Sequence, residues 1–281
     1  MTVAHLDHAL RRASGADSRF VQRLAADLDL PSVASRRDVR AARRKDESLE
    51  EAARRVRRAF LMETARTTGA DAIATGHTLD DQAETILMRL ARGAGPSALA
   101  AMAPAGPGPF VKPLLGIERA ALRRWLRKRR LTFRDDASNA SLAFDRNRVR
   151  RLVMPMLAKA LNPQAARHLV EAAGRLREDA AYLDASARER FDAIATRRAD
   201  ILAIQAPALA ALPHPIAARV ALLALAAAGC DPRRLSSRHI DAVVSLGPAA
   251  PGASLDLPGR IGARRRGRLL EFGPCVCPEK S

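Results

Sequence analysis

The chain has 281 residues, which is enough for one large domain or two smaller ones with separate hydrophobic cores. It carries 48 lysines and arginines against 30 aspartates and glutamates, a net charge of +18 in which arginine supplies nearly all of the excess. Its three cysteines form no disulfide framework, no apolar run is long enough to span a bilayer, and the N-terminus has no export signal. We therefore expect a cytoplasmic protein rather than a secreted or membrane protein.

The positive charge favours a polyanionic partner. The fork of the guanidinium group fits phosphate oxygens, and a basic surface attracts nucleic acid of any sequence. A general bias of composition toward arginine and alanine is the alternative, and it would also explain the alanine-rich run at 221–228. Composition alone leaves both explanations open.

The first third of the chain alternates between short extended segments and helices. Residues 2–8 form a strand-like run, and residues 18–29 have apolar side chains at helical spacing. Pro31 ends this helix and leads into a second extended segment at 32–39, which completes a β-α-β unit. A long amphipathic helix follows at 47–68.

The pattern then repeats, with a short buried strand at 71–75 and a helix at 80–91. Repeated strand-then-helix units predict a parallel sheet with helices on both faces. Ligands of such sheets bind at the carboxyl ends of the strands, which here fall at 5–8 and 76–81.

The rest of the chain is predicted to be mainly helical. Its expected elements are a loop at 104–109, a short basic helix at 122–130, a long charged helical region at 162–210, two helices at 215–246, and a β-hairpin at 253–272 around Pro258-Gly259. The change of composition near Leu161 predicts a domain boundary there, with one domain at 1–160 and another at 161–281.

The strongest motif is at 76–85, which reads Gly-His-Thr-Leu-Asp-Asp-Gln-Ala-Glu-Thr. It follows a strand and opens a helix, so His77 and Asp81 lie beside a helix N-terminus, which attracts phosphate. Adjacent aspartates in that place are suited to hold Mg²⁺ or to accept a proton from a nucleophile. A helix cap with a structural histidine would explain one aspartate but not the whole string.

Two arginine-rich segments accompany this motif. Residues 136–150 contain an Asp-x-Ser-Asn sequence and then three arginines at alternate positions around Asn147, an arrangement that can contact phosphates. In the segment 47–58, Arg54 and Arg57 share one helical face. Each segment alone would more often be an ordinary solvated surface.

Together these motifs resemble the bacterial tRNA(Ile)-lysidine synthases of the ATP-pyrophosphatase (N-type PP-loop) superfamily. The resemblance covers most of the chain, is most specific at 136–150, and is weaker in the C-terminal segments. The similar segments are 5–11, 76–85, 92–95, 112–115, 136–150, 235–239 and 255–259.

The resemblance implies an α/β fold of the adenine nucleotide alpha hydrolase type, with a truncated parallel sheet and flanking helices, followed by a mostly helical tRNA-binding domain that ends in a small β-hairpin. It implies an enzyme that uses ATP and Mg²⁺ to adenylate C2 of the wobble cytidine in the CAU anticodon of tRNA(Ile). Free L-lysine then displaces AMP, and the product is lysidine. The oligomeric state stays open, a homodimer included.

The resemblance also assigns roles to single residues. The expected catalytic residues are His77, Asp81 and Arg146. The residues expected to lie beside the nucleotide are His5, Asp7, Gly76 and Arg54.

The sequence departs from the family pattern in the phosphate-binding loop. The family's Ser-Gly-Gly-x-Asp-Ser loop precedes the strand that corresponds to 2–5, and the chain has no such loop. The similar sequence at 14–18 lacks the second glycine and is interpreted as the start of a helix. We expect Met1 to be a misassigned start that leaves the parallel sheet truncated. Ala9 replaces a family glycine, and Arg58 stands where a tyrosine is usual.

Two other interpretations remain. The first is a catalytically inactive RNA-binding remnant of the family. The second is a tRNA-thiolating relative, which would use cysteines near the active site, whereas the first cysteine here is Cys230. Cys275 and Cys277 are interpreted as a tail without a metal site, and no metal-ligating cluster is expected.

Overall fold

The computed structural model describes residues 1–9, 14–45, 47–100, 102–106, 108–134, 141–198 and 201–274. The chain folds as two compact units, Met1–Ala173 and Gly174–Ser281. The boundary that we predicted at 160/161 falls before α8 (Ala165–Ile194), the helix that contains the division between the units. The motif residues 136–139 and Cys275 and Cys277 lie outside the described residues. Among the helices of the described part, none is both long and apolar enough to cross a membrane.

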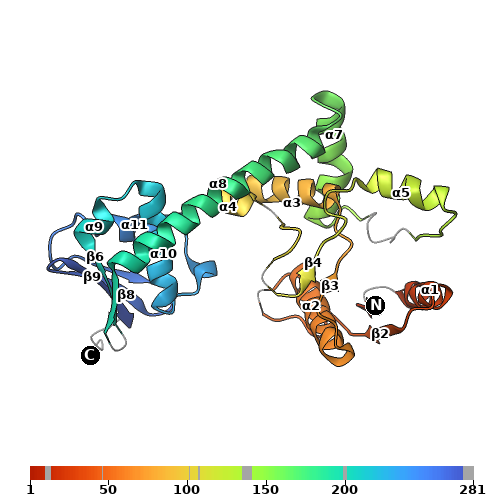
Figure 1. Cartoon of the computed structure of the whole chain (residues 1–281), viewed down its shortest axis with the longest axis horizontal. Coiled ribbons are helices and arrows are strands. Elements are labelled where there is room, and N and C mark those ends of the chain that lie inside the picture. The colour runs from red at the N-terminus through yellow and green to blue at the C-terminus, as the bar shows by residue number, and fades with distance from the viewer. Residues whose placement is uncertain are drawn as a thin grey trace. The chain divides into compact units, whose positions relative to one another are not determined.

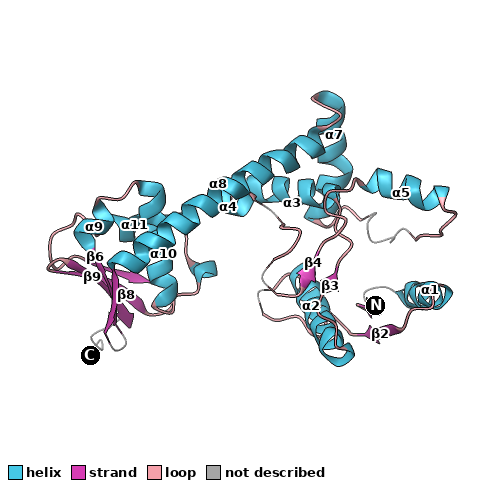
Figure 2. Cartoon of the chain, viewed as in Figure 1, coloured by secondary structure: helices cyan, strands magenta, loops and turns pink. Residues whose placement is uncertain are grey.

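The N-terminal unit contains two pairs of parallel strands with helices between them (Figures 1 and 2). Its elements before α8 are β1 (Val3–Asp7), α1 (Ser14–Asp27), β2 (Ser32–Arg36), α2 (Leu49–Thr68), β3 (Ile73–Ala74), α3 (Leu79–Ala91), α4 (Pro96–Leu99), β4 (Phe110–Val111), α5 (Arg119–Lys128), α6 (Asp145–Arg148), the π-helical turn η2 (Val149–Val153) and α7 (Met154–Ala160). β1 pairs with β2 and β3 pairs with β4, both in parallel, so the predicted parallel α/β class is confirmed.

In the described part of the chain, β1 and β3 belong to separate two-stranded sheets. The N–H of Val3 donates to Pro31 O, and Asp7 O accepts the N–H of Arg37, so alternate residues of β1 face β2. The backbone groups of Ala4 and Leu6 therefore point to the opposite edge. Helix α2 packs against both β1 and β3 and connects the two half-sheets.

Helix α2 has clear start and stop signals in the sequence. Ser48 and Glu51 form a reciprocal capping box, with the Ser48 N–H donating to the Glu51 carboxylate at 2.9 Å and the Glu51 N–H to Ser48 Oγ at 3.2 Å. Gly69 ends the helix in the left-handed conformation, with φ of 65°. The buried face of α2, with Ala52, Val56, and Phe60 at four-residue spacing, packs against Leu6 of β1.

Ala9, which follows β1, has a φ of 55°. An L-residue with a side chain is strained in this left-handed region, whereas glycine is not. We therefore expect Ala9→Gly to raise the free energy of unfolding of the N-terminal unit by up to about 1 kcal/mol. Urea unfolding of both proteins measures the difference. Ala41→Gly, in an exposed loop without a positive φ, is the control and should give no gain.

The C-terminal unit contains a five-stranded antiparallel sheet in the order β5-β6-β9-β8-β7. Its strands are β5 (Ala195–Arg198), β6 (Ile201–Gln205), β7 (Ser254–Leu257), β8 (Ile261–Arg266) and β9 (Leu269–Pro274), and its helices after α8 are α9 (Ala206–Ala210), α10 (His214–Ala227), the 3-10 turn η3 (Pro232–Arg234) and α11 (Ser237–Ser245). The apolar faces of α10 and the sheet form one large core that includes Val220, Leu270 and Phe272.

The predicted hairpin is present as β7 and β8, joined by a turn in which Gly259 has a φ of 90°. The helical prediction is wrong at 195–198 and at 201–205, which form β5 and β6. Leu202, Ala203 and Ile204 of β6 are buried between exposed ends, as expected for a strand with both faces covered. Pairing with β9, a partner more than 60 positions away in the sequence, stabilises this strand.

Candidate functional site

Five charged side chains meet at the N-terminal end of α3. Asp81 Oδ1 lies 3.0 to 3.1 Å from the guanidinium groups of Arg119, Arg146 and Arg150. Glu84 pairs with the same three arginines at 2.7 to 3.3 Å. The side chain of Glu84 is only 2% exposed. This arginine–carboxylate cluster thus holds three positive charges against two negative ones, and the largest part of it is shielded from water.

The local sequence explains how the cluster forms. Asp81 and Glu84 are three residues apart on α3 and therefore share one face. Asp81 is also the third residue of the helix, where its Oδ2 accepts the N–H and the hydroxyl of Thr78 at 2.8 Å each. On the opposite side, Arg146 and Arg150 are four residues apart across α6 and η2, so they share a face as well.

The three arginines around Asn147 do not act together as the alternating pattern suggested. Arg148 points away from the cluster, where it pairs with Asp145 and donates to Leu142 O at 3.1 Å. Asn147 is buried and its side-chain amide donates to Ser141 O at 2.8 Å, so it fixes the backbone between the two arginines that do enter the cluster.

The surroundings keep Asp81 ionised. Burial raises the pKa of its carboxyl group, but the hydrogen bonds from Thr78 and the charges of Arg146 and Arg119 outweigh burial and lower the pKa below its ordinary value. Because such a carboxylate is a weak base, it is better suited to hold a cation than to accept a proton.

A basic cavity of about 330 Å³ lies next to the cluster, between the ends of β1 and β3 and the side of α2. It contains five lysines or arginines against one glutamate. Its lining residues are His8, Glu50, Ala53, Arg54, Arg57, Arg58, Leu61, Thr75, His77, Phe110, Lys112 and Arg146. Three of the residues predicted from the sequence, Arg54, His77 and Arg146, therefore lie around one cavity whose charge suits a polyphosphate.

His77 lines this cavity and is held by Thr75, whose hydroxyl lies 2.9 Å from His77 Nδ1. Burial lowers the pKa of the imidazole; the charge of Asp81 opposes the shift, whereas Arg57, Arg146 and Lys112 add to it. His77 is therefore neutral at pH 7. Its contact with Thr75 is made by Nδ1 and does not involve Nε2.

This shift gives a pH dependence with a defined sign. The unfolded chain, in which His77 has its ordinary pKa near 6.5, binds the proton more readily than the folded chain, so stability falls as the pH drops below about 6.5. His77→Gln should remove this part of the acid sensitivity, by less than about 1 kcal/mol because the ring is half-exposed. Urea unfolding of the unmodified chain and of His77→Gln at pH 7.5 and 5.5 measures the difference. If both proteins lost the same free energy of unfolding between these pH values, the expectation would be contradicted.

The other residues predicted to lie beside the nucleotide, His5, Asp7 and Gly76, do not line this cavity. His5 is half-buried on β1 and is not among the lining residues. Asp7 is buried at the end of β1, accepts the N–H of Ala9 at 2.8 Å, and precedes His8, which does line the cavity. Gly76 has an ordinary φ, and a Cβ there would meet no atom within 4 Å, so the folded chain leaves open space beside its backbone.

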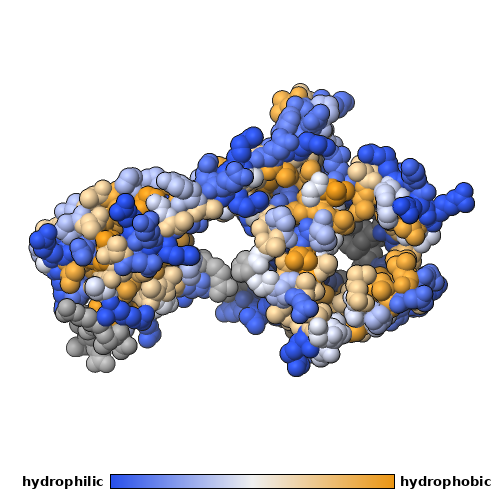
Figure 3. All heavy atoms as spheres, in the orientation of Figure 1, coloured by the Kyte–Doolittle hydropathy of each residue, from blue (hydrophilic) through white to orange (hydrophobic). Residues whose placement is uncertain are grey.

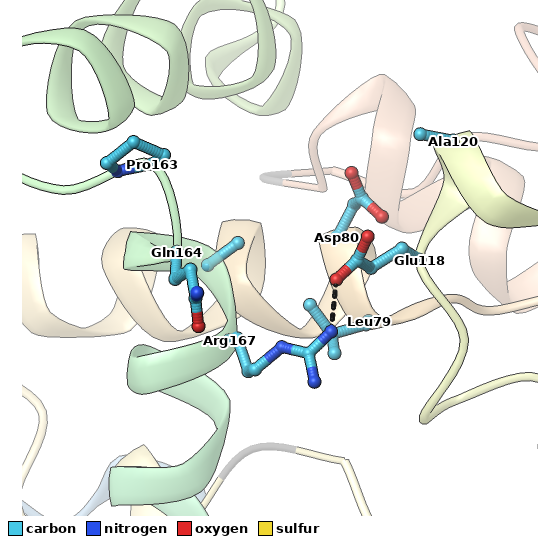
Figure 4. A pocket seen from close by; sticks show the side chains of 8 residues that line it. Leu79, Asp80, Glu118, Ala120, Pro163, Gln164 and Arg167 are labelled. Carbon is cyan, nitrogen blue, oxygen red and sulfur yellow. Dashed lines mark hydrogen bonds and ion pairs between the residues drawn. The ribbon is translucent and has the colours of Figure 1, made fainter.

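A second cavity of about 500 Å³ lies on the other flank of the α3 N-terminus, where Figure 4 shows Asp80 and Glu118 near Arg167 and Gln164. Its carboxylates already have partners. Asp80 accepts the N–H of Arg119 at 2.7 Å, and Glu118 pairs with Arg167 at 2.6 Å. With two carboxylates and one arginine, this cavity is less suited to a polyphosphate than the basic one.

The sequence indicated no role for Glu84 or Arg119. It indicated Arg150 only as one of the three arginines around Asn147 that could contact phosphates. The three-residue spacing of Asp81 and Glu84 was a usable signal, since it places both carboxylates on one helix face. Arg119 gave no such signal, because only the fold brings it to Asp81. Among the described residues, no group of three histidines, cysteines or acidic residues is arranged to hold a metal ion.

Comparison with known proteins places the chain in a family. Residues 1–157 match the family model described as a PP-loop domain. The chain is 40% identical over 266 residues to the tRNA(Ile)-lysidine synthase of Geobacter sulfurreducens, a match that covers 93% of this chain and 56% of the relative. It is 39% identical to that of Thermus thermophilus, with 97% and 52% covered. The chain thus spans a little more than half the length of these two relatives.

The tRNA(Ile)-lysidine synthase of a Methylobacterium species is closer in length. It is 39% identical over 288 residues, which cover 95% of this chain and 79% of the relative. Among solved structures, the U34-tRNA thiolase NcsA from Methanococcus maripaludis has a similar fold, with a TM-score of 0.52, 17% identity, and 63% of this chain and 61% of that chain covered. The chain therefore belongs to the tRNA(Ile)-lysidine synthase family of PP-loop domain proteins.

Proposed function

We propose that this protein is an ATP-dependent ligase that joins L-lysine to C2 of the wobble cytidine of tRNA(Ile) with the CAU anticodon, through an adenylated tRNA. The observation that carries the proposal is the arginine–carboxylate cluster beside the basic cavity. His77 and Arg146 line this cavity, and Asp81 pairs with Arg146 at 3.1 Å, which supports a role for these three residues in one reaction.

The cluster and the adjoining cavity offer groups for both the lysine and the phosphates of such a reaction. Lysine is a cation at its side chain, and the lowered pKa of Asp81 keeps its carboxylate ionised, so the ammonium group would compete with the three arginines for this negative charge. Arg146 belongs to the cluster and also lines the basic cavity, so one guanidinium reaches both the carboxylates and the space for phosphates. A neutral His77 is able to take the proton that the attacking amine loses.

The residues present fit ATP in part. Arg54, Arg57 and Lys112 supply positive charge for the phosphates, and Gly76 leaves room beside the backbone. The sequence contains no Ser-Gly-Gly-x-Asp-Ser loop, and residues 14–18 form the first turn of α1, as predicted. Mg²⁺ would have to arrive with the phosphates of ATP, since the carboxylates of the cluster are engaged by arginines.

The test is a direct assay. The purified chain is incubated with ATP, lysine and an unmodified tRNA(Ile) transcript, and the nucleosides of the digested tRNA are analysed by mass spectrometry. We expect lysidine and a matching release of AMP and pyrophosphate. Binding of the tRNA without lysidine formation would overturn the proposal in favour of an RNA-binding remnant.

A further inference from the structure

Helix α5 has a basic surface that is not part of the arginine–carboxylate cluster. Arg124, Arg127 and Lys128 lie at exposed positions of one helix face, followed by Arg129 and Arg130. Within the described part of the chain, none of these five side chains forms an ion pair with a carboxylate. In Figure 3 the surface over α5 is hydrophilic. We call Arg124, Arg127, Lys128, Arg129 and Arg130, together with Trp125, the α5 surface.

The α5 surface also carries an exposed aromatic ring. Trp125 is 50% exposed, and the guanidinium of Arg129 lies over its ring at 5.4 Å from the centroid. A half-exposed tryptophan among unpaired arginines leaves a large apolar face in water. Stacking of a base or sugar on the ring, with phosphates on the guanidinium groups, would cover both parts of the surface.

The start of α5 is fixed to the candidate site. Arg119, the first residue of the helix, pairs with Asp81 and Glu84, and its N–H donates to Asp80. At 1.5 Å per residue, Arg124 and Lys128 follow Arg119 by about 8 and 14 Å along the helix axis. A nucleic acid with its reacting base at the cluster therefore has its neighbouring phosphates within reach of this helix.

We propose that the α5 surface binds the sugar-phosphate backbone of the RNA substrate outside the reacting site. RNA is a better match than a lipid surface. A helix that binds a membrane exposes an apolar face, whereas Leu122 and Leu126 of α5 are half-buried and Trp125 is the large apolar side chain that the helix exposes. The proposal rests on the proposed function for the identity of the RNA, but not for the binding itself.

The experiment compares two pairs of arginines. Arg124→Ala/Arg127→Ala removes two charges from the α5 surface, and Arg19→Ala/Arg23→Ala removes two from exposed positions of α1. Binding of a labelled tRNA(Ile) transcript and of an unrelated tRNA transcript is measured by fluorescence anisotropy between 50 and 300 mM salt. For the α5 pair we expect Kd to rise roughly ten- to one-hundred-fold for both RNAs and the salt slope to fall by about 2. For the α1 pair, Kd and the salt slope should stay close to the values of the unmodified chain.

Trp125 supplies an independent readout because it is the only tryptophan of the chain. Its fluorescence should be quenched on addition of either tRNA, and Trp125→Phe should bind RNA more tightly than Trp125→Ala, since phenylalanine keeps a ring for stacking. Circular dichroism checks that all variants are folded.

Three results would overturn the inference: an unchanged Kd for the α5 pair, an equal loss for both arginine pairs, or tryptophan fluorescence that responds to vesicles with anionic lipid but not to tRNA. The last result would assign the helix to a membrane surface. Loss of RNA affinity in the α5 pair with no lysidine formed by the unmodified chain would refute the proposed function alone, because binding does not require turnover.

Discussion

Replacing Glu84 with alanine is expected to lower the free energy of unfolding of the N-terminal unit by about 3 kcal/mol. The physical reason is that the three arginines of the cluster would then share the single carboxylate of Asp81. We expect the lower end of the range for a broken buried pair because Arg119, Arg146 and Arg150 keep 22% to 28% of their side chains exposed, where water partly replaces Glu84. Glu84→Gln preserves the volume but removes the charge, so it should lower the free energy of unfolding by most of the same amount.

Urea unfolding measures this effect, and Trp125 reports on the unit that contains Glu84. Glu63→Ala is the matched control. Glu63 also pairs with an arginine, Arg37, at 2.7 Å, but its side chain is 56% exposed, so its loss should cost no more than about 1 kcal/mol. Equal effects of the two substitutions would show that the buried cluster has no special role in stability.

Asp81→Asn is expected to reduce lysidine formation by at least about 100-fold while leaving the Kd for tRNA within a few-fold of the unmodified value. Asparagine keeps an oxygen that can accept the hydrogen bonds of Thr78, so the start of α3 should remain intact. What it loses is the negative charge that faces three arginines and, in the proposed reaction, the ammonium group of lysine.

Single-turnover assays with saturating ATP and tRNA measure the rate, and filter binding measures tRNA affinity. Asp71→Asn, a substitution of an exposed aspartate just before β3, removes the same charge outside the cluster and should leave both quantities unchanged. Turnover by Asp81→Asn comparable to the unmodified chain would show that Asp81 does not take part in the reaction.

The parts of the fold that could be predicted are those with local signals. The capping box of Ser48 and Glu51 and the left-handed Gly69 define α2 from neighbouring residues alone. The strands β5 and β6 could not be predicted in this way, because Ile201–Gln205 becomes a strand through its pairing with β9, far along the chain. β3 and β4 have two residues each, but only β3 could be recognised, because it lies between a helix end at Gly69 and a turn at Gly76, whereas Phe110 and Val111 follow directly on a Gly/Pro-rich loop.

The same distinction holds for the candidate site. His77 and Asp81 belong to a contiguous motif, and Arg54 and Arg57 to one helix face, so the sequence indicated them. Glu84 is in the motif, but its burial follows from packing against arginines 35 to 66 residues away. No sequence spacing specifies such contacts. The roles proposed for His5 and Asp7 stay predictions.

The separate half-sheets have a consequence for how the N-terminal unit folds. β1 and β2 are connected through α1, and β3 and β4 through α3 and α4, so each pair forms from contacts that are comparatively close in sequence. Such local contacts form quickly, whereas those that join distant segments require slower loop closure. Helix α2 is the element that contacts both pairs. Its contacts with β1 join Leu6 to residues 46 to 54 positions away, compared with 29 for the pairing of β1 with β2 and 37 for that of β3 with β4. The docking of α2 onto β1 is therefore expected to be slower than the growth of either sheet.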